Sequence, residues 1–205
     1  LLRMEMLLMS LKQSPSVDSD SIRGALQEIV QAARDGAEAV QRISGISKSD
    51  PYEPSQLVDL SKVAEDVVNI SVGQFREKRG TRVHLDTTEV SEVFGSATAL
   101  RTVIMNIVIN ARQALKEGGD VWIRTRQENG WALIEVEDSG QGIPPELMDK
   151  ITQPFFTTKG EAGSGLGLSV ARKVIARHEG EIEFESTVGE GTTVRIRLPV
   201  VDEAR

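Results

Sequence analysis

The chain has 205 residues, of which 39% are hydrophobic and 27% are charged, and its formal net charge is -7. This composition is ordinary for a soluble globular protein, and the acidic balance argues against nucleic acid or an anionic membrane surface as the main partner. The chain contains no cysteine and two histidines, which excludes disulfides and thiolate metal sites and disfavours a histidine-based metal cluster.

The first 50 residues predict helices. Leu1–Lys12 is apolar and rich in Met, as expected for the tail of a helix. Its longest apolar run, Met6–Met9, is far too short to span a bilayer, so we expect no membrane contact by this chain. Gln13–Asp20 predicts a turn. A helix with a 3.5-residue apolar period follows from Ser21, typical of a coiled coil or an antiparallel bundle. The apolar positions are Ile22, Leu26, Ile29, Ala33, Gly36, Val40 and Ile43.

The bundle is favoured over an amphipathic helix on a globular core, because the small Ala33 and Gly36 suit close helix approach. The segment Ser47–Ser55 contains two prolines and predicts a linker. We therefore expect a helical hairpin remnant over residues 1–50 and a separate domain over residues 51–205.

The second domain mixes helices and strands without strict alternation. The predicted helices are Gln56–Glu77, Thr98–Lys116 and Gly165–His178; the predicted strands are Thr81–Asp86, Glu92–Gly95, Val121–Arg126, Trp131–Val136, Ile182–Ser186 and Thr192–Leu198. Asn129-Gly130 predicts a hairpin, and Glu137–Gly163 predicts a loop region. We expect an α+β fold, a two-layer sandwich with helices on one face of a mostly antiparallel sheet.

Two asparagines interrupt the most apolar predicted helix. Asn106 and Asn110 are four residues apart, so they share one face of that helix. Burying an amide without a partner costs about 1–3 kcal/mol, so this face requires polar groups opposite it. Hydrogen bonds to neighbouring backbone are the alternative, slightly favoured if the pair is considered alone.

An aspartate follows the end of the predicted strand Trp131–Val136. Asp138 is followed by Gly140 and Gly142, which allow a tight turn and close approach of a ligand to the backbone. A carboxylate only accepts hydrogen bonds, which suits the exocyclic amine of adenine. An ordinary surface turn would carry the same residues, so this motif is weak by itself.

Two further glycine-rich segments complete the set. Gly160–Ser169 leads into a helix, where free amides and the helix dipole favour phosphate. Neither a dinucleotide-binding pattern nor a P-loop fits these residues. Gly189–Thr193 leads into the last strand, and Thr192 shares the inward parity of Val194, so its hydroxyl is expected to support Asp138. The alternative for the first segment is a flexible surface loop, and the alternative for the second is a hairpin turn.

Taken in order, these motifs resemble the ATP-binding (Bergerat-type) fold shared by type II gyrases, a heat-shock chaperone, histidine kinases and the MutL repair ATPase. Pro154–Lys159, the following GSGLGLS and the run Asn106–Leu115 resemble sensor histidine kinases of the nitrogen-regulator type. The resemblance covers roughly residues 54–200. It implies binding of ATP and Mg2+.

The resemblance also implies roles for individual residues. Asn110 corresponds to the Mg2+ ligand, Asp138 to the adenine-reading carboxylate, and Lys159, in a lid over residues 144–162, to a contact of the γ-phosphate. Gln113 stands where many relatives carry Lys. The implied catalytic residues are Asn106, Asn110 and Lys159. The implied ATP-binding residues are Asn110, Arg112, Asp138, Gly140, Gly142, Ile143, Thr157, Thr158, Lys159, Gly163, Ser164, Gly165, Leu166, Gly167, Leu168 and Thr192.

Asn106 separates kinases from hydrolytic relatives, which place Glu there as general base. An amide cannot accept the proton of water, so slow hydrolysis and transfer to a protein acceptor are expected. Neither histidine qualifies as that acceptor, because His84 is predicted on the outward face of a strand and His178 at the end of a helix. We expect the acceptor histidine to lie before Leu1; proteolysis and natural loss are the alternatives.

The predicted protein is therefore the catalytic part of a histidine kinase, which pairs with a response-regulator receiver domain. Homodimerisation through the complete hairpin and a cytoplasmic location are also expected, whether or not the parent protein is anchored in the inner membrane. A serine kinase of the anti-sigma type and a non-catalytic nucleotide-sensing module on the same fold are the alternatives.

Overall fold

A computed structural model describes residues 53–75, 80–115, 118–159 and 165–201. The chain divides into two units, residues 1–50 and 51–205, and the predicted hairpin lies outside the described residues. The elements of the second unit, in chain order, are β1 (Gln56–Val58), α3 (Leu60–Phe75), β2 (Thr81–Thr87), β3 (Val93–Gly95), α4 (Ala97–Ala114), β4 (Gly119–Glu128), β5 (Trp131–Asp138), α5 (Pro145–Met148), α6 (Gly167–Arg177), β6 (Glu181–Thr187) and β7 (Gly191–Pro199).

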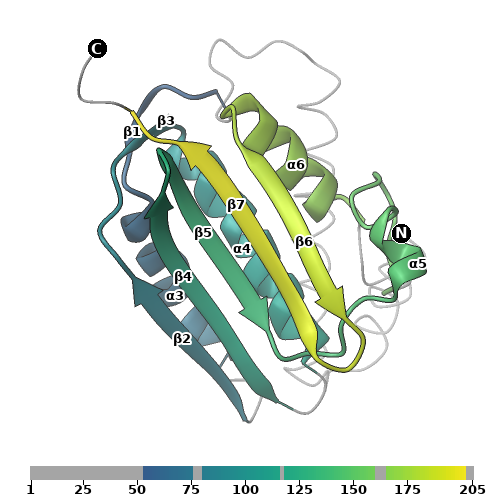
Figure 1. Ribbon diagram of the computed structural model, residues 1–205. Coiled ribbons are helices and arrows are strands. Elements are labelled where there is room, and N and C mark those ends of the chain that lie inside the picture. Colours follow the sequence, from purple (N-terminus) through teal and green to yellow (C-terminus); the bar gives the residue numbers. More distant parts are fainter. Residues whose placement is uncertain (1–52, 76–79, 116–117, 160–164, 202–205) are drawn as a thin grey trace, which may run out of the picture. The chain divides into compact units, whose positions relative to one another are not determined.

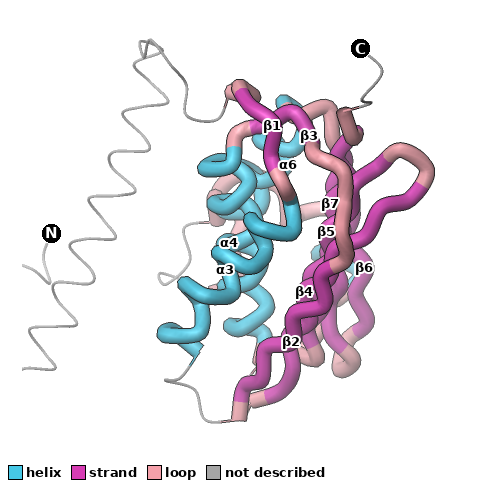
Figure 2. Tube along the Cα trace, turned by 90° about the vertical axis from the view of Figure 1, so that its left-hand side faces the viewer, coloured by secondary structure: helices cyan, strands magenta, loops and turns pink. Residues whose placement is uncertain are grey.

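Five strands form the main sheet in the order β2-β4-β5-β7-β6 (Figure 1). Strands β2 and β4 are parallel, and every other neighbouring pair is antiparallel. The helices α3, α4 and α6 lie along one face of this sheet, as Figure 2 shows. Strands β1 and β3 form a separate two-stranded antiparallel sheet. The predicted two-layer α+β architecture is confirmed.

The core lies between this sheet and the helices. Strand residues of one parity, such as Ile123, Ile134 and Ile196, are almost fully buried, and they face α4 residues such as Ile104 and Ile107. Burial of each such side chain contributes about 1.5–3 kcal/mol. The period-2 pattern of the strands and the apolar surface of α4 thus define one core, and α4 is its central helix.

Two predicted element assignments are wrong. The predicted helix Gln56–Glu77 begins at Leu60, because residues 56–58 pair with β3 instead. Asp59 determines this boundary: its Oδ1 accepts hydrogen bonds from the backbone N–H groups of Ser61 and Lys62, at 2.9 and 3.2 Å. The predicted loop region contains the short helix α5, whose first residue is Pro145.

No helix in the described part of the chain is both long enough and apolar enough to cross a bilayer.

Candidate functional site

Helix α4 carries both predicted asparagines on its half-buried side. Ser96 begins the helix by accepting a hydrogen bond from the backbone N–H of Ala99 at 3.2 Å. A Cβ at Gly167, the first residue of α6, would lie 3.8 Å from Asn106 Cγ. That is an ordinary van der Waals distance, so the start of α6 lies beside Asn106.

Asp138 ends β5 and is buried, with 6% of its surface exposed. Its Oδ1 accepts a hydrogen bond from the backbone N–H of Gly140 at 2.8 Å. Burial raises the pKa of Asp138 to about 6, although backbone hydrogen bonds from Gly140 and Thr192 oppose that shift. The carboxylate is still mostly ionised at neutral pH, in a place where few protein donors satisfy it.

The loop after Asp138 packs against the end of α4. The Gln141 N–H donates to the Ala114 carbonyl at 3.2 Å, and the Gly189 N–H donates to the Gln141 carbonyl at 2.9 Å. Gly142 has a φ of +68°, and a Cβ there would overlap the carbonyl of Thr187. A larger residue would therefore push this loop away from the β6–β7 turn.

Ser186, at the end of β6, joins three parts of the site, and sequence reasoning missed it. Its Oγ accepts a hydrogen bond from the Ile143 N–H at 2.8 Å and donates to the Gly191 carbonyl at 2.9 Å. It also lies 2.9 Å from Thr192 Oγ1. Thr192 is buried, as predicted, and directly opposite Asp138, but its hydroxyl bonds Ser186. The available signal was parity, because Ser186 follows Ile182 and Phe184 on the inward face.

Lys159 reaches α4 from the segment that follows α5. Its Nζ lies 2.7 Å from Asn110 Oδ1 and also donates to Gln113 Oε1. Although much of the Lys159 surface is exposed, desolvation of the ammonium by its surroundings lowers its pKa. Thr157 supports this placement, since its Oγ1 accepts from the Lys159 backbone N–H at 3.1 Å.

The remaining predicted residues surround this centre. The Phe155 N–H donates to the Gly165 carbonyl at 2.9 Å, which ties the segment before Lys159 to the glycine loop. Leu166 precedes α6 and Leu168 packs on the core, while Thr158 is exposed and Arg112 is half-buried on α4. Gly163 and Ser164 lie outside the described residues. The described motifs thus gather around the second half of α4 and the start of α6.

His178 is structural, as predicted from its position at the end of a helix. Its Nε2 lies 2.9 Å from the Ser96 N–H, and its Nδ1 lies 2.8 Å from the Val174 carbonyl. The Ser96 N–H can only donate, so Nε2 accepts. The Val174 carbonyl can only accept, so Nδ1 carries the proton of a neutral ring. Hydrogen bonding, rather than a charge facing the helix dipole, explains this histidine. His84 is exposed on β2, contacts Asp120 and stacks on Trp122.

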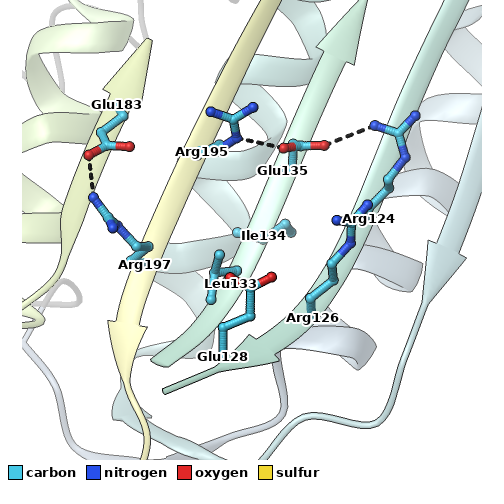
Figure 3. Close-up of a pocket in the computed structure, with 9 residues that line it drawn as sticks. All are labelled: Arg124, Arg126, Glu128, Leu133, Ile134, Glu135, Glu183, Arg195 and Arg197. Atoms are coloured by element: carbon cyan, nitrogen blue, oxygen red, sulfur yellow. Dashed lines mark hydrogen bonds and ion pairs between the residues drawn. The ribbon is translucent and has the colours of Figure 1, made fainter. Parts of the chain in front are cut away.

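The face of the sheet opposite the helices α3, α4 and α6 carries a pocket of about 330 Å3 (Figure 3). Glu135 lies between Arg124 and Arg195, at 2.9 and 2.7 Å, and Arg197 pairs with Glu183. None of the predicted site residues lines this pocket. Three of the four arginines that line the pocket, Arg124, Arg195 and Arg197, pair with carboxylates. We therefore interpret this face as a solvated ion-pair network, distinct from the site around α4.

Residues 95–202 match the family described as histidine kinase-, DNA gyrase B-, and HSP90-like ATPase. The match covers more than half of the chain, and the chain belongs to this family. The segment contains α4, Asp138, Lys159 and Thr192, so it encloses the whole site described above.

The relatives narrow the class. The chain is 40% identical over 113 residues to the signal transduction histidine-protein kinase AtoS of Escherichia coli (strain K12), covering 55% of this chain and 18% of that protein. It is 32% identical to the sensor kinase CckA of Brucella abortus (strain 2308), and the match covers 88% of this chain and 21% of CckA. The catalytic domain of the histidine kinase ThkA superposes with a TM-score of 0.63 at 32% identity, covering 70% of this chain and 94% of that domain.

These similarities confirm the expected resemblance to the ATP-binding catalytic domain of sensor histidine kinases. They do not favour the serine-kinase alternative. The chain spans about a fifth of the length of AtoS and CckA.

Proposed function

We propose that this chain is the ATP-binding catalytic region of a two-component sensor histidine kinase. The observation that carries the proposal is the convergence on α4 of a buried carboxylate loop, a lysine and a glycine-led helix. The Asp138 loop bonds the end of α4, Lys159 bonds Asn110, and Gly167 lies against Asn106. This arrangement provides an acceptor for a base at one end of the site and cationic and amide groups for phosphates at the other.

Each group matches one part of ATP. Asp138 accepts a hydrogen bond from the exocyclic amine of adenine, and the backbone of Gly140–Gly142 lies close to the base and sugar. Lys159 and the amides around Gly165 contact the phosphates. Lys159 is suited to the γ-phosphate because it is a compact cation on a flexible stem.

The oxygen of Asn110 fits Mg2+. It already accepts from an ammonium at 2.7 Å, so a cation is compatible with this position. The described residues contain no cluster of three or more His, Asp or Glu that could hold a metal, which agrees with an ion that takes most ligands from phosphate and water. When bound, Mg2+ neutralises charge on the triphosphate.

The chemistry proposed is phosphoryl transfer to an imidazole. The acceptor nitrogen forms a bond to the γ-phosphorus while the bond to the β–γ bridging oxygen breaks, leaving ADP. Asn106, at the position of the general base in hydrolytic relatives, cannot accept a proton from water. His178 cannot be the acceptor, since it is buried and both nitrogens are engaged. The acceptor is a histidine of the dimerisation hairpin, and not one of the catalytic unit.

The proposed partners follow from that reaction. The phosphoryl group passes from the acceptor histidine to a response-regulator receiver domain, and the hairpin predicted from the sequence of residues 1–50 contributes to homodimerisation. A cytoplasmic location is proposed because ATP and the receiver domain are available there.

The test is transfer of label from γ-labelled ATP to a supplied acceptor-helix domain from a histidine kinase of the same type. We expect an acid-labile phosphorylated product, absent when the acceptor histidine is replaced by Ala. An acid-stable product would indicate a serine kinase. Nucleotide binding without any transfer would indicate a nucleotide-sensing module.

A further inference from the structure

Two neutral side chains of α4 hold a charged one from a distant segment. Asn110 and Gln113 are three residues apart, so they lie on the same side of the helix. The ammonium of Lys159 contacts Asn110 Oδ1 at 2.7 Å and Gln113 Oε1. Both amide oxygens therefore point toward one cation.

We propose that Lys159 occupies the cation position beside Asn110 in the nucleotide-free protein, and that Gln113 is the positioning residue that keeps it there. A Mg2+ ion that arrives with a nucleotide has to displace the ammonium from Asn110 Oδ1. The inference rests on the proposed function, because it takes Asn110 as the metal ligand.

Simple electrostatics requires this displacement. An ammonium and a divalent cation bound to one amide oxygen would lie within a few ångströms of each other, and their repulsion is large when neither charge is neutralised. In the described part of the chain, no carboxylate lies within ion-pair distance of Lys159. A phosphate is therefore a better partner for Lys159 than the two amides. The ammonium moves to phosphate as Asn110 is released to the metal.

Gln113 contributes through its acceptor. Lys at this position, as in many relatives, would repel Lys159 from Asn110, whereas the Gln113 oxygen attracts it. Gln113 is exposed, so its replacement leaves the core intact. Its effect on Mg2+ is expected to pass through Lys159 and not through direct coordination.

The test uses ADP, which lacks the γ-phosphate that Lys159 is proposed to contact. Titration calorimetry gives the ADP dissociation constant in EDTA and in Mg2+. The dissociation constant in EDTA divided by that in Mg2+ measures how much the metal increases the affinity for ADP. We expect Gln113→Ala and Lys159→Met each to raise this ratio about threefold to tenfold, which corresponds to loss of a hydrogen bond that competes with the metal. The double variant should match Lys159→Met, because Gln113 acts through Lys159.

Lys150→Met is the matched control, since Lys150 is an exposed lysine of the same segment, and it should leave the ratio unchanged. A lower ratio in Gln113→Ala, as expected for a lost direct ligand, would overturn the inference, and so would an unchanged ratio in both single variants or additive effects in the double variant. Failure of the wild-type chain to bind ADP would instead refute the proposed function.

Discussion

Replacement of Asp138 by Asn is the sharpest perturbation that the structure offers. The carboxylate accepts from Gly140 N–H at 2.8 Å, and in the proposed complex it also accepts from the adenine amine. An amide has a single acceptor atom, and its NH2 group is a donor. In Asp138→Asn, either the adenine amine or the Gly140 N–H faces another donor.

The expected loss combines two contributions. A hydrogen bond to a charged group contributes about 1.5–3 kcal/mol, and a buried donor without an acceptor costs about 1–3 kcal/mol. Together they predict an affinity for ATP or ADP weaker by about seventyfold or more, which calorimetry would record as a large loss of binding. Asp120→Asn is a useful control, because the Asp120 side chain bonds only Arg82 and His84 among the described residues, and the substitution leaves the backbone hydrogen bonds of Asp120 to Ser139 in place.

The pKa of Asp138 adds a pH test. Because the ionised form is the acceptor and its pKa is about 6, wild-type affinity for ADP should fall about tenfold per pH unit below 6. Above pH 7 the affinity should be constant. Unchanged affinity in Asp138→Asn at pH 7.5 would refute the assignment of Asp138 to adenine.

The same pKa predicts the opposite effect on folding. A carboxyl whose pKa is raised from 3.8 to about 6 in the folded state destabilises the fold as pH rises through that range, by about 3 kcal/mol in total. The free energy of unfolding of Asp138→Asn, relative to wild type, should therefore increase by about that amount between pH 4 and pH 7. Urea denaturation of both proteins measures it, and a pH-independent difference would contradict the desolvation of Asp138.

The remaining predictions concern other residues of the domain. Ser186→Ala leaves the Ile143 N–H without its acceptor, so ADP affinity should fall about tenfold; unchanged affinity by calorimetry would remove Ser186 from the site. His178→Ala should lower the free energy of unfolding by about 3–5 kcal/mol in urea, because the backbone N–H of Ser96 loses the ring nitrogen that accepts from it and a cavity forms. His84→Ala, on the exposed face of the sheet, should cost less than about 1 kcal/mol, and equal losses would contradict this reasoning. Finally, ATP hydrolysis without an acceptor should be slow because Asn106 is no base, and Asn106→Glu should accelerate phosphate release.

Local sequence determined most of the elements. Apolar parity along the last strand identified β7, the hairpin signature identified β4 and β5, and the apolar run with two asparagines identified α4. The hairpin at Asn129-Gly130 is confirmed, with φ values of 49° and 81°, since few other residues adopt this conformation. Asp138 was expected at the end of a strand, and it is the last residue of β5. These features depend on neighbours in the chain, which sequence patterns record directly.

Contacts between distant segments decided the rest. Residues 56–58 form a strand because β3 is available to pair with them, and the helix begins only after Asp59, which caps its N-terminus. The sequence left Gln113 without a role until folding placed Lys159, 46 positions away, against it. The partners of Ser186 likewise come from other parts of the chain. Residue types and their order therefore determined which groups the site contains, whereas packing around α4 decided which of them meet, because hydrogen bonds act over a few ångströms in space regardless of separation in sequence.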